Sequence, residues 1–191
     1  MVGKIILASS SPRRAQILRK AKIEVEIMPS PYIEDHTRTA FSYDFIENLA
    51  YNKAKALLPV VEKPSLIIGA DTVVVLDNEI LGKPHNAENA YNMLKKLSGK
   101  THFVVTSIAV INSETGEYKL NSTTSYVTFE DLNDEQINYY VENYKPFDKA
   151  GSYGIQEMPD GYIKSYTGNL ENIIGISSES LKELLKEFGV N

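Results

Sequence analysis

Residues 102–129, HFVVTSIAVINSETGEYKLNSTTSYVTF, decide the fold class. They hold two long runs rich in β-branched and aromatic residues, about 102–112 and 117–129, and the polar residues around Gly116 between them favour a turn. Two strands that are joined by such a short turn form an antiparallel pair. Elsewhere, strand and helix patterns alternate, which is typical of an α/β protein. We therefore expect a long mixed, twisted sheet flanked by helices, and not an all-parallel doubly wound sheet.

A strand followed by a helix is predicted near the N-terminus. Residues 4–9 form a short apolar run that is typical of a buried strand. Ser11 suits the N-cap of a helix and Pro12 its first position, and this helix should end near residue 20. Residues 23–28 alternate apolar and charged side chains, which indicates a half-buried strand.

Further helices are predicted where a capping residue precedes apolar residues at helical spacing. Ser42 and Asn133 are typical N-caps, and a helix also fits residues 86–97. The remaining expectations are a turn at Asp77-Asn78, a loop with short strands over 145–168 and a terminal helix around 181–188.

The composition suits one compact domain. The chain has 191 residues, 42% of them hydrophobic and 24% charged, so burial of apolar surface can offset the entropy of ordering. We expect a single domain over 1–191, built from two closely fused lobes. The net charge of −5 argues against long nucleic acid as a partner, because that binding depends on neutralising many phosphates. A small anionic ligand needs only a few local cations.

The chain contains no cysteine, which excludes disulfides and thiolate chemistry. No segment approaches the roughly 20 apolar residues of a membrane span. The apolar run near the N-terminus is also too short for the core of a signal peptide. We expect no membrane partner and a cytoplasmic location.

Residues 9–14, Ser-Ser-Ser-Pro-Arg-Arg, carry more charge than a helix start requires. A helix N-terminus offers unpaired backbone N–H groups and positive partial charge, so it attracts anions. Arg13 and Arg14 in the first turn are unfavourable against the helix dipole, and a bound phosphate would reverse that cost. Two interpretations remain open: a phosphate site, or a capped helix with solvated arginines.

Asp71 interrupts an otherwise apolar stretch, LIIGADTVVVL, over residues 66–76. An ionised carboxylate placed there is costly unless it meets a cation or a metal ion. Gly69 would allow other groups to approach the backbone closely. The alternative is a strand-end carboxylate that forms a turn with Thr72. The apolar runs on both sides favour a functional role.

Two lysines and one loop are further candidates. Lys53 lies near the inner face of its helix, where its stem could simply cover apolar surface. Lys83, between a glycine and a proline, is either presented by a fixed loop or solvated. The loop 148–156, DKAGSYGIQ, suits a pocket wall. In that wall Gln156 would read a base edge or satisfy a local carbonyl, and Tyr153 would pack.

Several known motifs do not occur. There is no Walker loop, no G-x-G-x-x-G and no G-x-S-x-G elbow, which argues against a serine hydrolase. His36, His85 and His102 lack metal-ligand spacing, so each fits a surface position or a satisfied polar group better than a metal site.

Taken in order along the chain, several segments resemble the Maf family: LASSSPRR at 7–14, GADTVV at 69–74, LGKP at 81–84, MLKKLSGKTH at 93–102 and DKAGSYGIQ at 148–156. The resemblance implies a fold like that of the inosine triphosphate pyrophosphatases, with two lobes and a central cleft. It implies hydrolysis of a nucleoside triphosphate to the monophosphate and pyrophosphate with a divalent metal cation, Mg²⁺ or Mn²⁺. It also implies that two copies can form a homodimer.

The resemblance further implies a role for single residues. Asp71 corresponds to the general base, Lys53 and Lys83 to catalytic cations, and Glu34 with Asp71 to the metal ligands. The substrate-binding residues implied are Ser9, Arg13, Arg14, Thr72, Lys149 and Gln156. Arg13, Thr72 and Gln156 are similar to the branch that acts on dTTP and UTP, with modified pyrimidine triphosphates as further candidates.

Two other functions are compatible with the same residues. The first is a nucleotide- or nucleic-acid-binding regulator of septum formation without turnover, which the family's name suggests. The second is a phosphomonoesterase for small phosphates. Metal-dependent release of pyrophosphate separates the expected enzyme from both alternatives.

Overall fold

The computed structural model describes residues 3–35 and 38–190, and a seven-stranded sheet forms its centre. The strands lie in the order β2-β1-β3-β5-β6-β7, with β4 paired to β3. β1 runs parallel to β2 and β3, and the other pairings among the described strands are antiparallel. The predicted mixed sheet and its antiparallel portion are confirmed. The strands are β1 (Lys4–Leu7), β2 (Glu26–Ile27), β3 (Ser65–Leu76), β4 (Glu79–Leu81), β5 (Thr101–Asn112), β6 (Tyr118–Phe129) and β7 (Ile163–Thr167).

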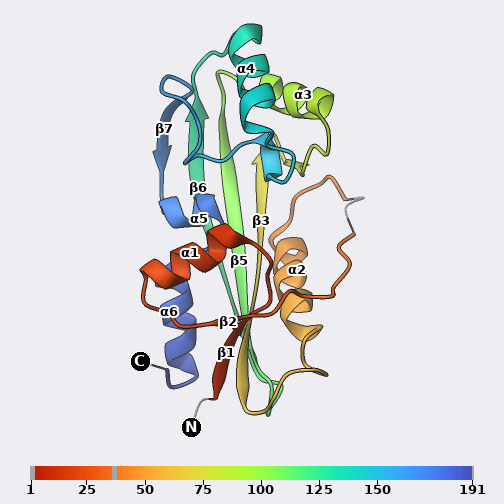
Figure 1. Ribbon diagram of the computed structural model, residues 1–191, viewed down its shortest axis with the longest axis vertical. Helices are drawn as coiled ribbons and strands as arrows, with labels where there is room; N and C mark the ends of the chain where they lie inside the picture. Colours follow the sequence, from red (N-terminus) through yellow and green to blue (C-terminus); the bar gives the residue numbers. More distant parts are fainter. Residues whose placement is uncertain (1–2, 36–37, 191) are drawn as a thin grey trace.

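Helices gather at the two ends of an elongated molecule (Figure 1). β3, β5 and β6 run along its length, α3 and α4 lie at one end, and α1, α2 and α6 lie towards the other. None of the described helices is long and apolar enough to cross a membrane. The helices are α1 (Pro12–Lys20), α2 (Tyr43–Lys55), α3 (Ala87–Leu97), α4 (Asp134–Tyr144), the short 3₁₀ helix η1 (Ala150–Ser152), α5 (Leu170–Ile174) and α6 (Ser178–Glu187).

The predicted helix caps and the predicted turn are confirmed. The side chains of Ser11, Ser42 and Asn133 each accept a hydrogen bond from the backbone three residues later, at the starts of α1, α2 and α4. Asp77 and Asn78 both have positive φ, 51° and 67°, and form the tight turn between β3 and β4.

Two expectations about elements were incomplete. The strand predicted over 23–28 is wrong in length, since only Glu26 and Ile27 are paired, and both are exposed. β2 lies at the edge of the sheet, but the apolar residues before it are covered, since Ile23 is buried in one cluster with Leu18 of α1 and Val25 packs against that cluster. α5 was not predicted, because a helix of five residues shows no apolar period.

Helices cover both faces of β3. Ile68 packs in one cluster with Leu18 of α1 and Leu181 of α6. The next residue, Ile67, packs in another cluster with Ala54 and Leu57, at the end of α2 and just after it. Because neighbouring residues of a strand point to opposite faces, β3 is buried between these layers.

A third cluster lies at the other end of the sheet, where α3 and α4 contribute Leu94 and Ile137 beside Phe129 of β6. From these separate cores along shared long strands we infer two closely fused lobes within one domain.

A close approach of α2 to β3 depends on Gly69. A Cβ atom built at Gly69 would lie 2.0 Å from the carbonyl oxygen of Ala50 and 2.8 Å from the amide nitrogen of Ala54. Any other residue would therefore push the helix away from the strand. This contact brings the last turns of α2 over the middle of β3, and so brings Lys53 to Asp71.

His102, at the start of β5, is buried in the core under α3 and α4, with 2% of its surface exposed. Its Nε2 lies 2.6 Å from Tyr153 Oη, and its Nδ1 has no hydrogen-bond partner among the described residues. Of the other histidines, His85 is exposed, and His36 lies outside the described residues. Burial lowers the pKa of His102 from 6.5 to about 4.

This buried imidazole predicts a loss of stability in mild acid. His102 binds a proton less readily in the folded state than in the unfolded chain. The neutral imidazole therefore contributes fully to the free energy of unfolding above pH 6.5, and this contribution is lost as the pH falls towards 4. The lowered pKa corresponds to roughly 3 kcal/mol over that window. We expect the free energy of unfolding to fall more steeply for the wild type than for His102→Gln, measured by urea denaturation at several pH values. Parallel curves for the two proteins would contradict the prediction.

Candidate active site

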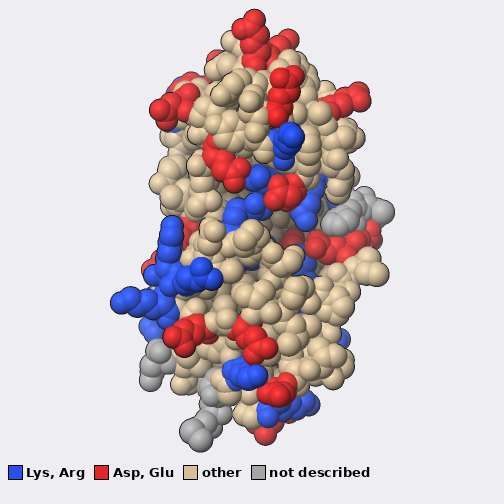
Figure 2. Space-filling view, in the orientation of Figure 1, with Lys and Arg blue, Asp and Glu red and all other residues tan. Residues whose placement is uncertain are grey.

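A cleft of about 800 Å³ opens between the two ends of the molecule. Figure 2 shows Lys and Arg side chains gathered around a hollow in the middle of this face, with Asp and Glu side chains beside them. The cleft brings together every site residue predicted from the sequence: Ser9, Arg13, Arg14, Glu34, Lys53, Asp71, Thr72, Lys83, Lys149 and Gln156.

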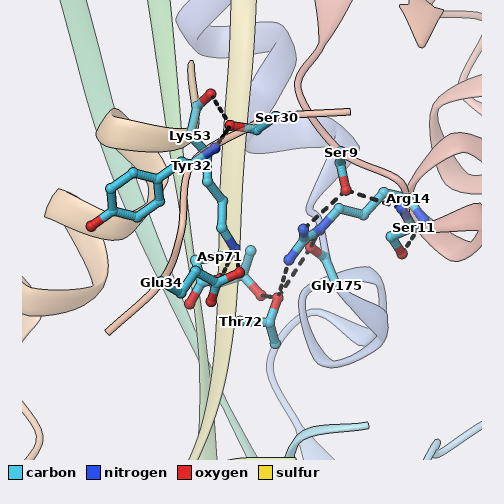
Figure 3. Close-up of polar contacts among 11 residues, drawn as sticks. Ser9, Ser11, Arg14, Ser30, Tyr32, Glu34, Lys53, Asp71, Thr72 and Gly175 are labelled. Carbon is cyan, nitrogen blue, oxygen red and sulfur yellow. Dashed lines mark hydrogen bonds and ion pairs between the residues drawn. The ribbon is translucent and has the colours of Figure 1, made fainter. Parts of the chain in front are cut away.

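Asp71 and Lys53 both line this cleft and form an ion pair (Figure 3). Asp71 lies in the middle of β3 opposite Ser107 of β5, and not at a strand end, so the turn interpretation is wrong. Its carboxylate accepts a hydrogen bond from the ammonium of Lys53, which comes from α2. The side chains are only 10% and 11% exposed. Lys53 therefore does more than cover apolar surface: its charge is held inside the cleft.

Glu34 supplies a second carboxylate to the same ammonium. Its Oε1 lies 2.9 Å from Lys53 Nζ, so two acidic side chains converge on one cation. The segment that carries Glu34 is attached to α2 through Ser30, whose hydroxyl donates to the backbone oxygen of Lys53 at 2.8 Å (Figure 3). Among the described residues, no group of three or more acidic or histidine side chains could hold a metal ion.

Arg14 is buried behind the phosphate-binding segment predicted from the sequence. Its guanidinium donates to Ser9 Oγ at 3.3 Å, to Thr72 Oγ1 at 3.1 Å and to the carbonyl oxygen of Gly175 at 2.9 Å. Burial lowers the pKa of Arg14, and the charges of Asp71 and Glu34 oppose that effect. An arginine remains protonated under such conditions. Arg14 thus ties the start of α1 to β3 and to the end of α5.

The first turn of α1 points its backbone into the cleft. Ser11 caps the helix through a 3.4 Å hydrogen bond from the Arg14 amide, and its own amide donates to Ser9 Oγ at 3.1 Å. Ser9, Ser10, Pro12 and Arg13 also line the cleft. The interpretation as solvated arginines is wrong for Arg14, which is buried. The arrangement is that of a helix N-terminus able to bind an anion.

Ion pairs join the two sides of the cleft. Asp148 accepts from Arg13 Nη1 at 3.1 Å and from Lys149 Nζ at 3.0 Å, and Lys149 also contacts Glu157 at 3.3 Å. Burial raises the pKa of Asp148, but the hydrogen bonds from Lys149 and Arg13 outweigh it and hold that pKa below its usual range. Lys149 itself is 8% exposed. An incoming anion would meet two cations that a single aspartate now holds together.

Lys83 and Gln156 complete the wall on the α3 side. Both are exposed in the cleft, and Lys83 makes no hydrogen bond or ion pair with the described residues. The backbone of Gly151 donates to the carbonyl oxygen of Gly82 at 3.1 Å, which joins the loop of Lys83 to that of Lys149.

Sequence reasoning missed the residues behind Thr72. Its hydroxyl lies 2.9 Å from that of Thr106, which donates to the backbone oxygen of Asn172. The Asn172 side chain is fully buried and bonds to Val104, Ser125 and the amide of Thr106. The available signal was a polar residue inside the apolar segment LENIIGI over 170–176.

Comparisons with known proteins identify the family of this chain. The sequence matches the family described as Maf-like protein over residues 4–188. A relative from Ruminiclostridium cellulolyticum named dTTP/UTP pyrophosphatase is 41% identical over 184 residues, which cover 96% of this chain and 95% of that protein. A relative of the same name from Phocaeicola vulgatus is 42% identical over 187 residues, with 96% and 95% covered.

The fold also resembles that of a HAM1 protein from Coxiella burnetii. The TM-score is 0.52 at 17% identity, and the match covers 98% of this chain and all of that one. This likeness concerns the fold alone and agrees with the expected long mixed sheet flanked by helices. Because the family match and the relatives span nearly the whole sequence, the chain belongs to the family of Maf-like proteins.

Proposed function

We propose that this protein hydrolyses dTTP and UTP to the monophosphate and pyrophosphate. The observation that carries the proposal is the cleft itself, where a buried aspartate paired with a lysine faces cations from three other segments. Its volume of about 800 Å³ suits a nucleotide. The names of relatives that are 41% and 42% identical support the choice of pyrimidine triphosphates.

The triphosphate would bind along the cation-lined side of the cleft. In this proposal Ser9, the backbone at the start of α1 and the two arginines hold phosphate oxygens. Lys83 and Lys149 neutralise the charge that develops on the departing pyrophosphate. Thr72 and Gln156 complete the substrate-binding set, with Gln156 on the exposed wall where a base can reach it.

In this proposal Asp71 acts on the attacking water. Its carboxylate would orient a water molecule or accept its proton as the water attacks the α-phosphorus. The bond between the α- and β-phosphates then breaks, and pyrophosphate leaves. Lys53, which already donates to Asp71, would stabilise negative charge on the phosphoryl group being transferred.

We also propose that Glu34 and Asp71 hold the divalent metal cation, Mg²⁺ or Mn²⁺. Carboxylate oxygens are the ligands these ions prefer, and the two carboxylates already converge on one positive charge, the ammonium of Lys53. Since the described residues offer no larger acidic cluster, water and the triphosphate would complete the ligands. When bound, the metal would neutralise phosphate charge.

Product analysis on a panel of nucleoside triphosphates tests the proposed reaction. We expect Mg²⁺- or Mn²⁺-dependent release of pyrophosphate from dTTP and UTP, with little from 7-methyl-GTP or ATP and no orthophosphate. The two products are scored separately on purified protein. Release of orthophosphate would indicate the phosphomonoesterase instead, and tight nucleotide binding without turnover would indicate the regulator of septum formation.

Two further expectations stay predictions. The cytoplasm, where nucleoside triphosphates are made and used, is our proposed location. The homodimer is to be measured by sedimentation of the purified protein.

A further inference from the structure

A buried hydrogen bond joins β5 to the loop that carries Lys149. His102 Nε2 lies 2.6 Å from Tyr153 Oη, and the two residues are 2% and 6% exposed. Phe129 of β6 packs edge-on against both rings, with centroids 5.3 Å from His102 and 5.0 Å from Tyr153. Aromatic contacts with Phe129, which does not line the cleft, thus hold both rings of the pair.

Counting donors and acceptors assigns the direction of this bond. If the imidazole donated, the Tyr153 hydroxyl proton and Nδ1 of His102 would both lack partners among the described residues. If Tyr153 donates to Nε2, only Nδ1 is left without one, and it is the one buried side-chain polar atom of the described residues that lacks a partner. Tyr153 is thus the donor. An unsatisfied polar atom in a core is retained against a cost, so this histidine needs a reason beyond packing.

The loop around Tyr153 is hydrogen-bonded to other segments on both sides of that residue. The amide of Gly154 donates to Tyr140 Oη at 3.2 Å, and the amide of Gly151 donates to the carbonyl oxygen of Gly82 at 3.1 Å. The stem of Lys149 lies against Gly154, where an added Cβ atom would come within 3.2 Å of Lys149 Cε. The placement of Tyr153 therefore sets the path of the Lys149 side chain, and the Gly151–Gly82 bond extends that support to the loop of Lys83.

We propose that His102 and Tyr153 are positioning residues, whose hydrogen bond holds the loop 149–156 so that Lys149 and Lys83 face the phosphates of the substrate. The proposal rests on the proposed function for the identity of the anion. Tyr153 lines the cleft, but its hydroxyl is hydrogen-bonded to His102 in the core, so the polar atoms of neither residue would contact the triphosphate.

Tyr153→Phe removes only the hydroxyl, and Tyr162→Phe is its matched control. Tyr162 is 5% exposed in the same core cluster, its hydroxyl donates to the backbone oxygen of Gln136 at 2.9 Å, and it does not line the cleft. We expect Tyr153→Phe to raise KM for dTTP and the inhibition constant of inorganic pyrophosphate about fivefold or more, with a smaller change in kcat. Tyr162→Phe should leave both constants within about twofold. These fold-changes are of the size expected when one charged contact is weakened.

Coupling between the two residues is measured with His102→Phe and the double variant. If the pair acts as a unit, the double variant has a KM close to that of either single variant. Additive effects of the two substitutions, or a Tyr153→Phe protein that behaves like Tyr162→Phe, would overturn the proposal.

Hydrogen exchange separates this proposal from the proposed function. Amides of residues 149–156 should exchange faster in Tyr153→Phe than in Tyr162→Phe, whether or not the wild type releases pyrophosphate. A wild type without turnover would reject the reaction alone. Equal exchange of this loop in the two variants would reject the positioning role.

Discussion

Asp71→Asn is expected to lower kcat for pyrophosphate release from dTTP by about 10³-fold, which is typical for loss of a general base. Asparagine keeps the shape of the side chain but cannot accept the proton of the attacking water. The fold should persist, because Lys53 keeps Glu34 as a partner at 2.9 Å and no new cavity forms. Nucleotide binding should change little, since the proposed phosphate contacts come from cations of other segments.

The kinetic measurement is paired with calorimetric binding of a non-hydrolysable dTTP analogue. Asp160→Asn serves as the control, because Asp160 is exposed and does not line the cleft. It should match the wild type in both experiments. Turnover that survives in Asp71→Asn would remove this residue from the reaction.

Lys53→Met is expected to have two opposite effects. It should lower kcat by about 10²-fold, as expected for loss of one charge that stabilises the transition state. It should also tighten binding of Mn²⁺ to the nucleotide-free protein by about tenfold, or about 1.4 kcal/mol. Glu34 and Asp71 now share the Lys53 ammonium, and without it their mutual repulsion favours a divalent cation.

Free Mn²⁺ can be titrated by electron paramagnetic resonance in the absence of nucleotide. Lys83→Met removes the same charge from the same cleft, at a lysine without an ion pair to the described residues. It should lower activity but leave Mn²⁺ affinity within about twofold, because Lys83 forms no ion pair with Glu34 or Asp71 and water screens its exposed charge. If Lys53→Met binds Mn²⁺ no more tightly than the wild type, the two carboxylates do not form the metal site.

Several of the proposed active-site residues could be found in the sequence because they break a local rule. Asp71 puts a charge into an apolar run, and two arginines stand at a helix start where the dipole disfavours them. These conflicts are visible without coordinates. By contrast, the sequence around Asn172 and Tyr153 does not show which strands they contact.

The N-caps, the Asp77-Asn78 turn and the long β5–β6 pair follow from interactions between residues close in sequence, so their residue types were enough to predict them. The pairing of Lys53 with both carboxylates was decided only in the folded chain, where Gly69 lets α2 approach β3 closely enough for the charges to meet. The same holds for Arg14. The sequence predicts a cation beside a phosphate, but the hydrogen bonds of Arg14 to Thr72 and Gly175 join residues that are 58 and 161 positions apart in the chain. Such contacts arise from packing of distant elements, which local residue preferences do not encode.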